Sequence, residues 1–129
     1  MVAKAKVRTA AGTNERQRRK LAAVASTTRD DAESKFDRLI YERVRLGIMS
    51  ALAVREEMSF NELKALFDIS DGNLGAHARK LEDAGYVSCT KGFEDRRPRT
   101  VYRITPQGRA ALNRYLDHVE AVIKATRGG

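Results

Sequence analysis

The residues in this sequence that are best suited to specific binding are amide and basic side chains in two short segments. In the first segment, residues 70–84, Asn73 and Arg79 lie near the small residues Gly72 and Ala76. An amide can pair with adenine through two hydrogen bonds, and a guanidinium can pair with guanine or with a phosphate. Small residues would let the backbone approach a groove closely, although they also fit a helix that discriminates poorly between its targets.

A helical period orients this first segment. Leu74, Ala78 and Leu81 recur at i, i+4 and i+7, which marks the buried side of a helix. Each residue turns the helix by 100°, so Gly72 and Arg79 point to solvent. The candidate contacts on this helix are Ser70, Asp71, Gly72, Asn73, Gly75, Ala76, His77, Arg79 and Lys80.

Two of these residues have commoner explanations, and none makes an active site. An acid in a first turn, such as Asp71, usually stabilises the helix dipole, although it could accept from cytosine. His77 lies about 60° from the buried stripe, which favours a half-buried packing or phosphate-contacting role. Neither His77 nor His118 belongs to a recognised nucleophile–acid motif, and residues 72–75 lack the rest of a phosphate-binding loop. The sequence therefore predicts no enzyme.

The second segment is basic and separates two strand-like stretches. Tyr86–Thr90 and Arg99–Ile104 alternate as strands, and Lys91–Pro98 has the composition of a charged loop, so a hairpin is expected. Arginines there would contact phosphates or enter a minor groove, whereas the plain alternative is a solvated turn. The candidate contacts are Lys91, Arg96, Arg97 and Arg99.

Two short helices joined by a tight turn are predicted before the hairpin. A short strand, Met58–Phe60, precedes a helix over Asn61–Phe67, and Ser59 with Glu62 forms a capping box. Ser70 then caps the helix that ends before Gly85, where a left-handed residue is needed.

A longer helix is predicted from Phe36 to Ala53. Ile40, Val44, Ile48 and Leu52 form one apolar stripe at intervals of four residues. A second apolar face indicates a second surface to bury, which we assign to a partner subunit. That face contains Leu39, Leu46 and Met49.

The C-terminal residues 106–129 are expected to form a dimerisation helix. Thr105 followed by Pro106 is a strong helix start. The apolar stripe that follows is longer than a small core can cover, which predicts a subunit interface. Its candidate residues are Leu112, Tyr115, Leu116, Val119, Val122 and Ile123.

The net charge of +8 is concentrated at the N-terminus. Residues 1–29 contain eight basic residues and one acidic residue, whereas the other 100 contain 17 basic and 16 acidic residues. We therefore expect a basic, largely disordered arm over residues 1–34, with a frayed helix near Gln17–Ala25, that contacts a polyanion. A solubilising tail and an organellar transit peptide have similar compositions.

Composition limits the classes of protein and of site that are possible. The 129 residues suffice for one domain, and no apolar run is long enough to span a membrane. The single cysteine, Cys89, excludes an internal disulfide and a cysteine-built zinc site, and it is expected to be a small buried hydrophobe. No metal and no cofactor is predicted.

The arrangement of residues 38 to about 120 resembles the winged helix-turn-helix transcriptional regulators of the MarR and ArsR groups. The likeness rests on the pattern DGNL..H...LE.AGYV, then K.F..R.P.T.Y..T..G, then a terminal helix. It implies an α+β, mostly helical fold, with a DNA-binding domain at residues 35–105. It also implies a dimeric regulator in which helix 70–84 enters the major groove and wing 91–99 lies on the backbone or minor groove. The cysteine pair of ArsR-type metal sensors is missing here, so a metal inducer is not expected.

Two functions of different classes follow. The first is a homodimeric, sequence-specific regulator of duplex DNA, most simply a repressor, in a prokaryotic cytoplasm. The second is a winged helix that docks another protein and binds no specific DNA. RNA binding is disfavoured because no exposed aromatic platform is evident. The operator, the regulated genes and any small-molecule effector are not specified by the sequence.

Overall fold

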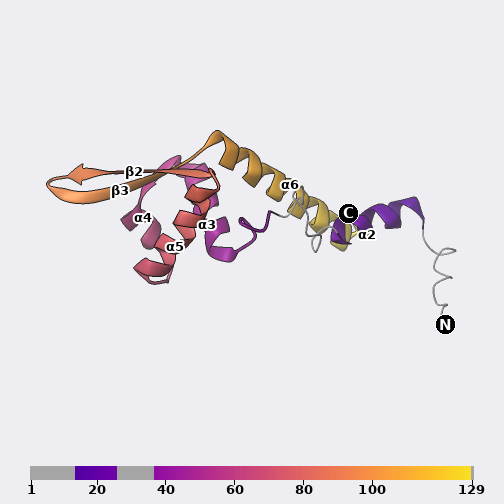
Figure 1. Cartoon of the computed structure of the whole chain (residues 1–129). Helices are drawn as coiled ribbons and strands as arrows, with labels where there is room; N and C mark the ends of the chain where they lie inside the picture. Colours follow the sequence, from indigo (N-terminus) through magenta and orange to yellow (C-terminus); the bar gives the residue numbers. More distant parts are fainter. Residues whose placement is uncertain (1–13, 26–36, 129) are drawn as a thin grey trace. The chain divides into compact units, whose positions relative to one another are not determined.

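The computed structural model describes residues 14–25 and 37–128 of the chain (Figure 1). Residues 37–115 form one unit, and the other described residues, 14–25 and 116–128, belong to a second. The elements are α2 (Glu15–Ala25), α3 (Arg43–Arg55), β1 (Glu57–Ser59), α4 (Phe60–Lys64), α5 (Asp71–Asp83), β2 (Val87–Glu94), β3 (Arg97–Ile104) and α6 (Pro106–Arg127). This order confirms the mostly helical α+β class.

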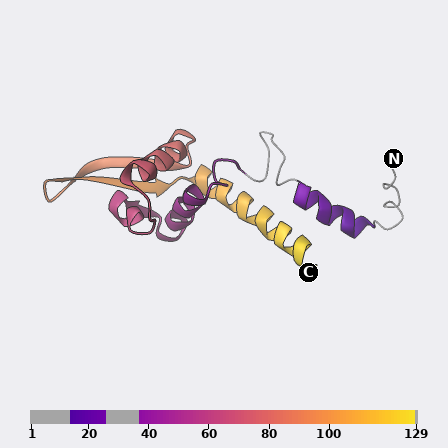
Figure 2. The same ribbon diagram turned by 90° about the horizontal axis from the view of Figure 1, so that it is seen from below.

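A three-stranded antiparallel sheet connects the helices of residues 37–115. Its strand order is β1-β3-β2, so β3 is central. Tyr102 on β3 pairs with Met58 on β1 and with Cys89 on β2. The β2–β3 hairpin extends beyond α4 and α5, and it does so from both viewing directions (Figures 1 and 2).

The buried residues confirm the predicted inward faces. Ile40, Ile48 and Leu52 are fully buried and Val44 is nearly so. On α5, the inward triplet is Leu74, Ala78 and Leu81, and none is more than 1% exposed. The core therefore fixes which side of α5 faces solvent.

The predicted start of the first long helix was wrong. α3 begins at Arg43, because Glu42 has extended backbone dihedrals and its side chain accepts a hydrogen bond from Arg45 N. Residues 38–40 form a turn that Asp37 stabilises by accepting from Leu39 N at 2.8 Å. Phe36 lies outside the described residues. Ile40 is buried but lies in the turn before the helix. Its spacing of four residues from Val44 therefore made the helix appear to begin earlier than it does.

The capping predictions for the two short helices are confirmed, although α4 is shorter than expected. The Ser59–Glu62 capping box is present, but α4 ends at Lys64 rather than at Phe67. Ser70 Oγ accepts from Asn73 N at 3.1 Å and starts α5. Gly85 follows α5 with a φ of +82°, the left-handed conformation that glycine adopts without strain.

The hairpin loop is much shorter than predicted. β2 and β3 pair outward as far as Glu94 and Arg97, which leaves a two-residue turn of Asp95 and Arg96. Most of the expected loop Lys91–Pro98 is therefore strand. These outer residues are exposed, and their sequence lacks the apolar alternation of a strand with one buried face.

α6 starts as the Thr105–Pro106 signal predicts. Thr105 Oγ1 accepts from Gly108 N at 2.9 Å, which caps the first turn. Gly108 packs closely against the chain after α5, because a Cβ built on it would lie 2.1 Å from the Tyr86 carbonyl oxygen. The first turn of α6 is thus fixed at the base of the hairpin.

In the second unit, α2 is a basic helix. Asn14 caps it by accepting from Gln17 N at 2.8 Å. None of its residues is buried. The rest of the expected disordered arm lies outside the described residues. Among the described helices, none is long and apolar enough to cross a membrane.

Candidate nucleic-acid interface

The outer face of α5 presents polar and small residues together. Asn73, Ala76, Arg79 and Lys80 are exposed, and Gly75 is half-buried. Neither Arg79 nor Lys80 forms an ion pair with another residue that the structure describes. Gly72 and Gly75 have open space where a Cβ would be, so the α5 backbone there is accessible to a large ligand.

His77 is held from inside the protein rather than presented to solvent. Its Nδ1 lies 3.0 Å from Arg45 Nη1 and 3.7 Å from Glu42 Oε1. Arg45 is itself fixed, because its Nε donates to the Leu39 carbonyl at 2.6 Å. The half-buried packing role expected for His77 agrees with this geometry.

Ser70 and Asp71 serve the start of α5. Ser70 caps the helix through Asn73 N, and the carboxylate of Asp71 forms an ion pair with Lys64 of α4. This pair crosses the turn between the two short helices. Both side chains remain exposed enough to lie at an interface, but each already has an intramolecular partner.

A groove of about 410 Å³ separates α5 from the hairpin. Gly72, Gly75, Ala76 and Arg79 line it from α5, and Cys89, Lys91 and Tyr102 line it from the sheet. Burial, and then the neighbouring Cys89 thiol, raises the pKa of the Tyr102 phenol to about 12, so this phenol is uncharged at neutral pH. The charged side chains that line the groove are the cations Arg79 and Lys91 and the carboxylate Glu82 of α5.

The hairpin tip places two arginines in solvent. Asp95 and Arg96 have φ values of 52° and 68°, the left-handed region that a two-residue hairpin turn requires. Asparagine and glycine are usual there, so an arginine is an unfavourable choice for the backbone. Arg96 and Arg97 form no ion pair with a described residue.

Arg99 has a different role from its neighbours. Its Nε lies 3.4 Å from Glu94 Oε1, and its Nη2 lies 4.0 Å from Glu62 Oε1 on α4. A hydrogen bond from Ser59 N, followed by one from Arg55, lowers the pKa of Glu62 and keeps it anionic. Arg99 therefore braces the hairpin against α4 while remaining partly exposed.

Comparison with known proteins decides the family. The model of the family described as "Winged helix DNA-binding domain" matches residues 44–123. This chain belongs to that family. α4 and α5 form the helix-turn-helix of this fold, and the β2–β3 hairpin is its wing.

Similar proteins include archaeal relatives of the winged helix. An uncharacterized protein of Methanocaldococcus jannaschii is 38% identical over 73 residues, which cover 57% of this chain and 79% of the relative. The structure of a transcriptional regulator homologue from Pyrococcus horikoshii is 39% identical with a TM-score of 0.64, over 68% of this chain and 87% of that one. A MarR-family regulator from Enterococcus faecalis, 22% identical with a TM-score of 0.56 over 91% and 94% of the chains, shares the fold. The winged helix is thus a non-enzymatic, DNA-binding transcriptional regulator.

The residues expected at a dimer interface fall into two groups. Met49 is fully buried, and Leu112 and Tyr115 are only 2% and 6% exposed, so within the single chain these three side chains lie in the interior. The others keep free surface. Leu116 and Ile123 are exposed, and Leu39, Leu46, Val119 and Val122 are half-buried.

Sequence reasoning missed Phe93 on the wing. This aromatic side chain is 79% exposed, beside residues that are otherwise charged or small. A lone aromatic within a charged segment was the signal that could have identified it. Among the described residues, no three His, Cys, Asp or Glu side chains converge as a metal site would require.

Proposed function

We propose that this winged helix is a homodimeric repressor that recognises a specific duplex sequence. The recognition helix α5 reads the major groove through Asn73 and Arg79, and Arg96 and Arg97 of the wing contact the adjacent backbone or minor groove. The observation that carries the proposal is the outward face of α5, where an exposed amide and guanidinium accompany an accessible backbone at Gly72.

Charge supports the same assignment. Phosphates attract cations that are not neutralised by a carboxylate, and Arg79, Lys91, Arg96 and Arg97 form no ion pair with a described residue. They lie on both sides of the groove between α5 and the wing or at the wing tip. These positions suit phosphates on either side of one DNA groove.

The proposed dimer rests on α6. Leu116 and Ile123 each leave 45% of their surface exposed, and Val119 lies between them along the helix. Apolar residues in such a stripe are stabilised when a second copy covers them. A two-fold dimer would place two recognition helices about one DNA turn, roughly 34 Å, apart and would favour an inverted-repeat operator.

Repression is the simplest output of such a dimer, because bound protein excludes polymerase without a further contact. The archaeal relatives also support action in a prokaryotic cytoplasm, where the chromosome is accessible.

Salt dependence of duplex binding tests the proposal directly. The full chain is titrated into a fluorescent duplex of about 30 base pairs, selected from a random library, at several salt concentrations. The logarithm of the binding constant should fall linearly with the logarithm of the salt concentration. The slope should steepen by about 0.9 for each phosphate that the protein neutralises. As a control for loss of positive charge away from the proposed contacts, Arg109 and Arg114 of α6 are replaced by alanine, and this variant should keep the slope. Failure to select any duplex, or a flat slope, would favour the protein-docking function instead.

A further inference from the structure

We propose that Phe93 is a wedge that the wing inserts at a base step in the minor groove of bound duplex DNA. The inference rests on the proposed function and adds a means by which the wing deforms its target. Aromatic and aliphatic wedges of this kind partly unstack a base step and kink the duplex.

The part of the chain that the structure describes leaves the side chain of Phe93 largely uncovered. It is 79% exposed, and every residue from Lys91 to Pro98 is exposed as well. Its cross-strand partner in the sheet register is Pro98. This pair forms a small apolar patch at the outer end of the hairpin, beyond the reach of the core.

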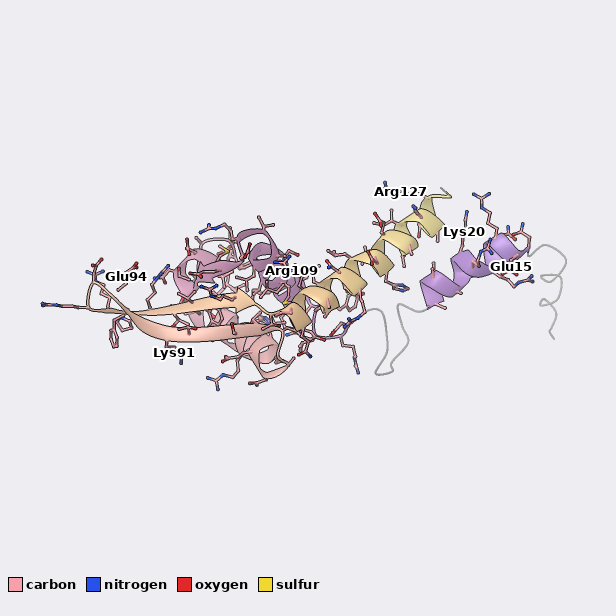
Figure 3. All side chains as sticks on the ribbon, turned by 90° about the horizontal axis from the view of Figure 1, so that it is seen from above. Glu15, Lys20, Lys91, Glu94, Arg109 and Arg127 are labelled. Carbon is pink, nitrogen blue, oxygen red and sulfur yellow. The ribbon has the colours of Figure 1, made fainter. Side chains whose placement is uncertain are left out.

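The strand alternation directs Phe93 toward the recognition helix side of the wing. Cys89 and Lys91 line the groove that faces α5, and Phe93 is two residues further out on the same strand face. Lys91 and Glu94 leave the hairpin on opposite sides in Figure 3, as this alternation requires. The phenyl ring therefore continues the line of groove residues toward the wing tip.

The size and surroundings of the patch favour DNA over a protein partner. Lys91, Arg96 and Arg97 are close in sequence to Phe93 and outnumber the acids there, since Glu94 pairs with Arg99 and only Asp95 remains. These three cations suit phosphates on either side of a groove. One ring with one proline is far smaller than the roughly 800 Å² per partner of a stable protein interface. A single ring is, however, sufficient to occupy one opened base step.

The absence of tryptophan from the sequence provides a direct probe. In Phe93→Trp, the indole is the single tryptophan and reports the surroundings of position 93. Binding to a duplex of about 40 base pairs rich in TpA steps, which open easily, should quench its emission and protect it from acrylamide. The matched control is Val54→Trp at the end of α3, where the native side chain is 83% exposed and the emission should not change.

Truncation tests the consequence for the DNA. Phe93→Ala should weaken binding to this duplex about tenfold, whereas Phe93→Leu, which keeps apolar bulk, should weaken it less. A 2-aminopurine placed at a TpA step should brighten when wild-type protein binds and stay dim with Phe93→Ala. Circular dichroism should show the same helical signal for all variants.

Two results would overturn the wedge while leaving the proposed function intact. One is wild-type affinity and 2-aminopurine brightening in Phe93→Ala. The other is a Phe93→Trp indole that remains open to acrylamide in a complex that salt titration shows to be formed. If Phe93→Ala loses its helical signal, Phe93→Leu and the Phe93→Trp emission decide between the outcomes. Failure of the wild-type chain to bind any duplex would instead refute the proposed function.

Discussion

Arg45 Nη1 on α3 lies 3.0 Å from His77 Nδ1 on α5. A guanidinium can only donate, so Nδ1 can accept in this contact only when the imidazole carries its proton on Nε2. The contact attaches the middle of the recognition helix to the helix behind it. Because Arg45 is also held by the Leu39 carbonyl, α5 has a polar attachment in addition to its apolar inward face.

Glu42, next to this pair, should make the free energy of unfolding depend on pH in the acidic range. Burial alone would raise its pKa, but the hydrogen bond from Arg45 N and the charges of His77 and Arg45 outweigh burial and lower it below the usual 4.5. The ionised carboxylate therefore stabilises the fold above that value, and this contribution is lost as pH falls through the lower folded value. In urea unfolding between about pH 5 and 3, Glu42→Gln should lose stability less steeply than wild type. Parallel curves for the two proteins would contradict this.

Adjacent residues of α5 should separate recognition from folding. Asn73→Ala should cost about 1–3 kcal/mol of discrimination between a selected operator and random duplex, if its amide reads a base. Leu74→Ala, one position away but fully buried, should instead destabilise the fold by about 3–5 kcal/mol through reduced burial and a cavity. Competition binding and thermal denaturation provide the two readouts. Equal weakening of both duplexes by Asn73→Ala would reassign the amide to the DNA backbone.

The wing turn should show opposite effects of one substitution on stability and binding. Arg96 has a φ of 68°, so Arg96→Gly relieves left-handed strain and should raise the free energy of unfolding by up to about 1 kcal/mol. The same change removes a solvent-facing cation and should lower duplex affinity. Urea denaturation and anisotropy measure the two effects, with Arg114→Ala as a cation control outside the wing. Unchanged affinity would mean that the Arg96 charge does not reach DNA.

A charge placed on α6 should separate the proposed subunits. Leu116 is 45% exposed, so Leu116→Glu costs little in the isolated chain but would place a carboxylate inside an apolar dimer contact. Sedimentation at micromolar concentration should find wild-type dimers and Leu116→Glu monomers. Asn113→Glu introduces the same charge at an exposed polar site of the same helix and should remain dimeric. A monomeric wild-type protein would refute the dimer.

The basic N-terminal arm should add affinity without changing preference. Deletion of residues 1–29 removes a net charge of +7, including the four basic residues of α2. The salt slope should flatten by about 0.9 for each phosphate that the arm no longer neutralises, while the ratio of operator to random binding is maintained. An unchanged slope would show that the arm does not bind DNA.

Sequence patterns were most reliable where a residue must meet a local backbone demand. Ser59, Ser70 and Thr105 were identified as caps because unpaired helix N–H groups require an acceptor. Gly85 was identified because a positive φ favours glycine. The inward face of α5 was equally clear, since burial imposes a period on apolar residues.

The outer wing and the interface residues were less predictable for physical reasons. An extended hairpin exposed on both faces has no apolar alternation, so charged residues from Lys91 to Pro98 resembled a loop. Apolar spacing also does not distinguish a residue buried in its own chain from one buried by a partner. Met49 and Leu112, which the spacing placed at a subunit interface, are buried within the single chain. The Arg99 brace depends on Glu62, 37 positions away, and no local pattern encodes such a pair.

The close approach of Gly108 to the Tyr86 carbonyl has a consequence for how substitutions in this protein could change the operator that it recognises. The first turn of α6 packs against the backbone of Tyr86, three residues after the end of α5, with no side chain between the two backbones, so there is no compressible layer to absorb a displacement. In the proposed dimer, we therefore expect a change in how two α6 helices pair to displace the recognition helices as well. Substitutions along α6 would then alter the number of base pairs between half-sites, while those on α5 would alter the bases within each half-site.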